Sequence, residues 1–179
     1  MIASPARCLV VAALLVLVHG APPARAQEES DDPLAIKVEP VTLPAGGTAE
    51  AIVTITLASG YGILAAPPPT PWTTAASLAV VSSGGVVARA ATFPPPKKSR
   101  DEDGGKEVSQ WTGTFAVRVP LEAAVKAAPG ERSLHGRLRY QLRFMESYYK
   151  VAIRDIDIPV KVVAAKKGSG GTGAPATRP

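Results

Sequence analysis

The sequence is poor in the residues on which redox chemistry, metal binding and nucleophilic catalysis most often depend. It contains one cysteine, Cys8, and two histidines, His19 and His135, in 179 residues. Because Cys8 lies in the N-terminal apolar segment, residues 9–179 offer no thiol for a disulfide, a nucleophile or a metal ligand. Aromatic residues make up only 5% of the chain. The composition therefore excludes a disulfide-rich scaffold and a cysteine-dependent enzyme.

The excess of positive charge is small, and long hydrophobic runs are lacking. The chain has 20 Lys and Arg against 15 Asp and Glu, and no basic stripe is interleaved with aromatic residues. We therefore expect no nucleic-acid partner. The one apolar run, from Cys8 to Val18, is shorter than the roughly 18–20 residues that a membrane-spanning helix needs.

The N-terminal segment has the pattern of a secretory signal. Arg7 precedes the apolar run, and the small-residue ending Ala24-Arg25-Ala26 follows it. This order predicts a signal peptide over residues 1–26, with a membrane anchor as the alternative. After cleavage before Gln27 the chain would be periplasmic or secreted, with no membrane span.

The remaining chain is long enough for one domain with a hydrophobic core. Residues 27–33 and 165–179 have little apolar surface to bury, so we expect a disordered leader and a disordered tail. The predicted domain occupies residues 34–164.

The clearest periodicity lies near the C-terminus. Apolar residues alternate with polar ones from Leu134 to Phe144, and again from Asp155 to Val162, as in strands with one buried face. Two such runs predict a hairpin. A chain reversal about Ser147 would place Arg139 opposite Asp155 and Arg137 opposite Asp157.

Further alternating segments are separated by Pro and Gly turns. Strands are expected within residues 34–43, 51–57, 60–64, 77–81, 85–92 and 107–119. The 77–81 and 85–92 segments should form a hairpin, residues 97–106 an exposed polar loop, and residues 121–128 one or two helical turns. About eight short strands predict an all-β protein, a single-domain antiparallel β-sandwich of the immunoglobulin-like kind.

A proline-rich loop, Ala66 to Trp72, follows the 60–64 strand. It is either a stiff connection that covers one end of the core with Trp72, which we favour, or a polyproline ligand for another domain. Trp72 is also the residue on which a carbohydrate- or cell-envelope-binding function would depend.

Candidate catalytic residues are few. His135 stands alone on a solvated strand face, and Asp155 and Asp157 face arginines that favour their ionised forms. The acidic run 101–103 lacks the ligand spacing of a calcium loop. We therefore expect no catalytic residue, no cofactor and no metal site, and interpret the chain as a protein that is not an enzyme. An enzyme with a dispersed acidic site is the remaining alternative.

Several short segments resemble the N-terminal domain of the DsbD thiol:disulfide interchange proteins. They are the strand ending Leu138-Arg139-Tyr140-Gln141, the segment GYGILAAPPPTPWTTAASLAVV and the run FPPPKK. The resemblance spans roughly residues 34–163. It implies an immunoglobulin-like sandwich exported to the periplasm.

The redox cysteines of that family are missing. Arg143 stands where the first is expected, and Tyr148 and Tyr149 lie where the second is expected. Thiol exchange needs a thiolate, so the resemblance implies a redox-inactive domain. It also implies that a docking surface for an exported, thioredoxin-like partner is retained, with Arg143, Tyr148 and Tyr149 as contact residues. Alternatively, the two tyrosines only pack the hairpin end.

Overall fold

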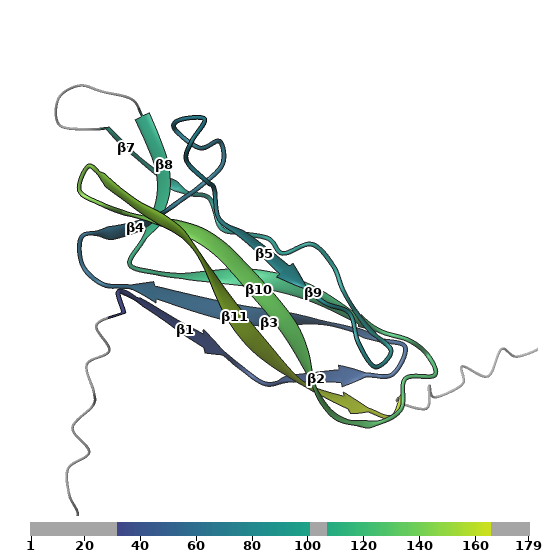
Figure 1. The fold of residues 1–179 in the computed structure, drawn as a ribbon. Helices are drawn as coiled ribbons and strands as arrows, with labels where there is room; N and C mark the ends of the chain where they lie inside the picture. The colour runs from purple at the N-terminus through teal and green to yellow at the C-terminus, as the bar shows by residue number, and fades with distance from the viewer. Residues whose placement is uncertain (1–31, 101–106, 166–179) are drawn as a thin grey trace, which may run out of the picture. The chain divides into compact units, whose positions relative to one another are not determined.

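The computed structural model describes residues 32–100 and 107–165, which belong to one compact unit. These residues form eleven strands and no helix (Figure 1). The strands are β1 (Leu34–Val38), β2 (Val41–Pro44), β3 (Thr48–Leu57), β4 (Tyr61–Leu64), β5 (Ser77–Val80), β6 (Val86–Ala88), β7 (Lys97–Arg100), β8 (Glu107–Thr112), β9 (Thr114–Ala123), β10 (Gly130–Phe144) and β11 (Ser147–Val163).

Several sequence-based predictions fall outside the described residues. They are the signal peptide, most of the leader, the tip of the polar loop at 101–106 and nearly all of the tail. Within the described ranges, no helix is long and apolar enough to cross a membrane.

The strands form two sheets. One has the order β1-β3-β9-β6, and the other has the order β2-β11-β10-β4-β8-β7, with β5 paired to β10. Every pair is antiparallel except β2 with β11, which run parallel. The predicted immunoglobulin-like β-sandwich is therefore confirmed, with one parallel pair at the edge of the second sheet.

The core lies between the inward faces of the two sheets. Ile55 of β3 and Val117 of β9 meet Leu134, Leu138 and Ile158 of the β10–β11 hairpin in one cluster of fully buried side chains. Each such side chain contributes about 1.5–3 kcal/mol relative to an exposed one. The two-residue alternation of the sequence thus determines which face of each sheet is buried.

The predicted hairpin is present, but the predicted register is wrong by two residues. Arg137 lies opposite Asp155, His135 opposite Asp157, and Arg139 opposite Ile153. Two features account for the difference in register between β10 and β11. The turn is Met145-Glu146, because Phe144 already pairs with Ser147, and a β-bulge interrupts β10 between Gln141 and Arg143.

Two predicted elements are divided between the sheets. The 107–119 segment breaks at Gly113, whose φ of 66° turns the chain from β8 in the second sheet to β9 in the first. The predicted hairpin of residues 77–81 and 85–92 is also wrong, because β5 pairs with β10 and β6 with β9.

Two local predictions are overturned as well. The expected helical turns over 121–128 are absent, because Leu121 and Ala123 continue β9 with their side chains in the core. Lys97–Arg100 of the predicted loop forms β7 and pairs with β8. Its polar residues suit an edge strand that remains in contact with solvent.

Candidate functional site

The turn between β10 and β11 carries an exposed methionine in a strained conformation. Met145 has a φ of 51°, and its side chain is 71% exposed. A left-handed conformation costs a residue other than glycine about 1–2 kcal/mol. The turn therefore holds an apolar side chain in solvent at a position where glycine would be less strained. Such strain is often found at functional sites.

Tyr149 anchors an aromatic cluster behind the turn. Its ring centroid lies 6.0 Å from that of Tyr61, which lies 4.7 Å from that of Phe144. A hydrogen bond with Tyr149 raises the pKa of Tyr61. The close approach of Phe144 to the chain at Gly60 leaves no space there for a side chain, because a Cβ atom would lie 2.7 Å from the ring. The cluster stiffens the hairpin end while Tyr149 stays 45% exposed.

Tyr148 and Arg143 lie on the other face of the hairpin. Tyr148 has the same parity as Ile156 and Ile158, which point into the core, and Arg143 is directly opposite Tyr148. The bulge has turned Arg143 to this face, where only 8% of its surface is exposed. Arg143 therefore offers little surface to a partner, whereas Tyr148 is 37% exposed.

Gln141 connects the hairpin end to the segment that directly follows the proline-rich loop. Its Nε2 donates a hydrogen bond to the backbone oxygen of Tyr149 at 2.8 Å, and its Oε1 accepts one from the backbone N–H of Thr74 at 2.7 Å. Gln141 is itself buried. A buried side chain that satisfies groups on two segments fixes their relative position. That segment and the hairpin end are therefore held together.

Trp72, in that loop, does not cover the core. Its surface is 77% exposed, so the interpretation of Trp72 as a core lid is wrong. The buried residue of this segment is Thr73, whose hydroxyl donates to the carbonyl of Thr70 at 2.8 Å. The loop packs through its threonines and directs the indole to solvent.

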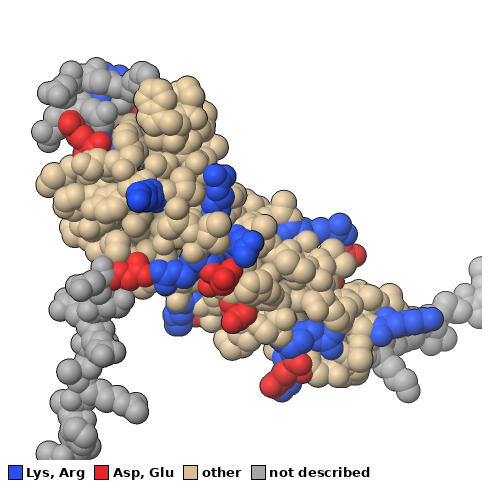
Figure 2. All heavy atoms as spheres, in the orientation of Figure 1, with Lys and Arg blue, Asp and Glu red and all other residues tan. Residues whose placement is uncertain are grey.

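The sequence-based prediction of the site did not include two apolar residues that lie next to the tyrosines. Val151 and Ile153 of β11 have the parity of Tyr149, point away from the core and are exposed. In Figure 2, much of the surface nearer the hairpin tip is uncharged, with a few cations and one group of acidic atoms, whereas clusters of both signs occupy the rest of this face. The alternation of β11 could have revealed the pair, since both share the parity of solvated Asp155.

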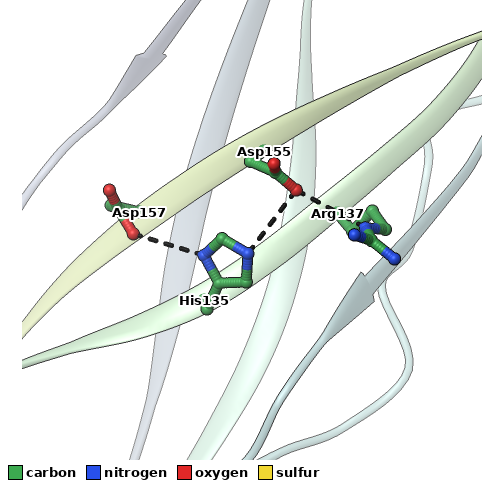
Figure 3. A network of polar contacts seen from close by, with 4 residues as sticks. All are labelled: His135, Arg137, Asp155 and Asp157. Atoms are coloured by element: carbon green, nitrogen blue, oxygen red, sulfur yellow. Dashed lines mark hydrogen bonds and ion pairs between the residues drawn. The ribbon is translucent and has the colours of Figure 1, made fainter.

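The polar residues farther along the hairpin contact one another (Figure 3). His135 places Nε2 3.5 Å from Asp155 and Nδ1 3.5 Å from Asp157, and Arg137 Nε lies 3.5 Å from Asp155. Both aspartates line an open groove of about 440 Å³ with Ser133 and other residues. All four side chains of the network are more than half exposed, and such ion pairs contribute about 0–1 kcal/mol.

Metal binding has little support in this network. The two carboxylates lie against different nitrogens of the His135 ring. Within residues 32–100 and 107–165, no group of three or more His, Cys, Asp or Glu side chains is placed to hold a metal ion.

No protein-family model and no curated protein sequence matches the chain. Among solved structures, it is similar to the N-terminal periplasmic domain of ScsB from Proteus mirabilis, with 12% identity, 74% of this chain and 48% of that chain covered, and a TM-score of 0.49. The chain thus spans about half the length of that domain.

Two other solved structures are similar to a lesser degree. The reduced N-terminal domain of DsbD from Neisseria meningitidis has 15% identity, 72% and 86% coverage of this chain and of that chain, and a TM-score of 0.40. The seventh ScaB type I cohesin from Pseudobacteroides cellulosolvens has 12% identity, 74% and 94% coverage, and a TM-score of 0.38. At these identities the likenesses concern the β-sandwich fold and identify no function.

Proposed function

We propose that this chain is an exported, redox-inactive and non-catalytic module that binds a protein partner through the end of the β10–β11 hairpin. The contact residues are Met145, Tyr148 and Tyr149, which we name the tip surface. The observation that carries the proposal is the exposed Met145 side chain, held in a left-handed conformation at the turn. Met and Tyr are enriched in protein interfaces relative to the rest of the surface.

The tip surface is rigid before a partner arrives. Tyr149 packs on Tyr61, and Gln141 binds the Tyr149 backbone. Ordering such side chains in advance lowers the entropy lost on association. Because Tyr148 and Tyr149 project from opposite faces of the hairpin, a partner with a groove that encloses the hairpin end fits this surface. The resemblance to the DsbD N-terminal domain makes a thioredoxin-fold protein the first candidate.

Affinity capture from an exported-protein extract tests this function, with the whole chain as bait. A specific partner should be recovered with the wild type and with Val87→Ser, a control at an exposed apolar residue on β6 of the other sheet. Tyr148→Ser and Tyr149→Ser should each lower recovery. Equal recovery with all four baits would contradict the tip surface as the site.

A second candidate is binding to carbohydrate or cell-envelope polymers, favoured by the 77% exposure of Trp72. An indole face in solvent can stack on a sugar ring. Retention on cell-wall polysaccharide that persists in Trp72→Tyr and disappears in Trp72→Ala would support this function. Equal retention of Trp72→Ala and the wild type would exclude Trp72 as the binding residue.

A further inference from the structure

One side of β11 is open over most of its length. β10 pairs with β11 from Ser147 to Val162, while β2 covers the opposite side only at Val160–Val163. Among the strands that the structure describes, none pairs with that side over residues 147–159. The backbone groups along such an edge are available to a further strand.

The open segment carries an apolar strip on its outward face. Tyr149, Val151 and Ile153 follow one another at every second position, and Ile153 is 57% exposed. We name these three residues the edge strip. Edge strands are usually protected by charged side chains, yet the first charge of this face along β11 is Asp155, which already contacts Arg137 and His135.

We propose that a second copy of this chain pairs antiparallel along this edge, about a two-fold axis at Val151. Val151 then faces Val151 of the second copy, and Tyr149 faces Ile153. On the other face of the strand, Lys150 faces Ala152 and Tyr148 faces Arg154. Aromatic residues opposite β-branched ones are favourable cross-strand pairs. The edge strip is thus complementary to itself.

Neighbouring registers are worse for identifiable reasons. Centring the axis on Ala152 sets Lys150 against Arg154, and centring it on Lys150 or Arg154 sets a cation against its own copy. Centring it on Ile153 places Val151 against Asp155. Directly opposed like charges destabilise a ladder.

A centre at Tyr149 fails for a different reason. It shortens the paired segment to residues 147–151, because the turn lies just beyond Ser147. A centre at Val151 extends the segment over residues 147–155 and avoids each of these conflicts.

The dimer is a property separate from the proposed partner binding. The paired segment begins at Ser147, so Met145 stays outside it, and the two hairpin tips point in opposite directions. Tyr149 belongs to both the tip surface and the edge strip, and Tyr148 of the tip surface lies within the paired segment. Met145→Gly and Ile153→Lys therefore separate the two surfaces, since each changes a residue that only one of them contains.

The near absence of cysteine makes the register directly measurable. In the full chain carrying Cys8→Ser, Val151→Cys places two thiols at a directly opposed pair, within the Cβ separation at which strand neighbours can form a disulfide. Ile153→Cys alone separates the two thiols by four residues along the strand, about 13 Å. A mixture of Tyr149→Cys chains with Ile153→Cys chains brings the thiols together again. Ile52→Cys, on the exposed face of β3, is the matched control.

Under mild oxidation we expect Val151→Cys to form covalent dimers at least tenfold faster than Ile52→Cys or Ile153→Cys. The mixture should form the heterodimer at a comparable rate. Without cysteines, sedimentation should show a dimer for the wild type and for Met145→Gly, and a monomer for Ile153→Lys. A rate for Val151→Cys equal to that of Ile52→Cys, faster cross-linking of Ile153→Cys alone, or a monomeric wild type at high micromolar concentration would overturn the proposal.

Discussion

Gln141 Nε2 donates a 2.8 Å hydrogen bond to the backbone oxygen of Tyr149, across the hairpin end just inside the bulge. The same amide accepts from Thr74, so one buried side chain sets the position of the segment after the proline-rich loop and of a tip-surface residue. The hairpin end is therefore stabilised by a buried polar contact as well as by the aromatic cluster.

Replacing Gln141 should weaken both segments. In Gln141→Leu the Thr74 N–H and the Tyr149 carbonyl each lose a partner in a part-buried hydrogen bond, and the full loss for a buried group is about 1–3 kcal/mol. We expect a loss of that size in the free energy of unfolding by urea, together with faster amide exchange at Thr74. Thr56→Val, which removes the exposed hydroxyl contact to Thr114, is the control and should change stability by less than about 0.5 kcal/mol. Equal losses in the two variants would contradict a special role for Gln141.

Substitutions at two glycines with positive φ distinguish the cost of backbone strain from the cost of a steric clash. Gly60 has a φ of 84° and Gly113 a φ of 66°, but only Gly60 lies against a ring, that of Phe144. Both Gly→Ala changes should cost about 1 kcal/mol in backbone strain. Gly60→Ala should cost about 1 kcal/mol more and change the near-ultraviolet circular dichroism, because Phe144 must move away from Tyr61. Identical unfolding energies would show that the aromatic cluster adapts freely.

The N-terminal ion pair predicts a pH dependence of stability. The hydrogen bond from Arg154 lowers the pKa of Asp32 below its ordinary value of 3.8. A depressed folded-state pKa contributes stability above the unfolded value, and this contribution disappears as the pH falls through the folded one. Since both side chains are partly exposed, Asp32→Asn should cost about 0.2–1 kcal/mol at pH 7.

The cost of Asp32→Asn should shrink to zero as the pH falls below 3.8 toward 2, measured as the difference in unfolding free energy from the wild type. Glu39→Gln is the control, because Glu39 makes only an exposed 3.6 Å contact with Lys37. A cost that stays constant across this pH range would show that Asp32 acts without its charge.

The alternation of apolar residues was sufficient to predict the β-sandwich and its main hairpin. Leu134 and Ile158 lie on the buried face because residues two apart in a strand share a face, and the residues that follow each of them at that spacing are apolar. The register was not predictable in the same way. Its turn uses Met145 in place of glycine or asparagine, and a bulge interrupts β10 before Arg143.

The sequence pattern also failed to predict where the chain passes from one sheet to the other. Trp111 before Gly113 and Val117 after it have the same parity in the sequence, so the two strands were interpreted as one. At the candidate site, sequence reasoning identified Tyr148 and Tyr149 as tip residues but missed Met145. It also selected Arg143, whose side-chain direction depends on the bulge.

The most direct test of the account is partner recovery by Met145→Gly, expressed per folded molecule. Glycine relieves about 1–2 kcal/mol of strain and loses about 0.5–1 kcal/mol through its greater freedom in the unfolded chain, so stability should be unchanged or slightly higher. If the strained side chain is a contact residue, recovery of the specific partner should fall about tenfold while the protein stays folded. Full recovery with Met145→Gly, together with a rise in stability, would contradict the central claim that the hairpin tip binds the partner.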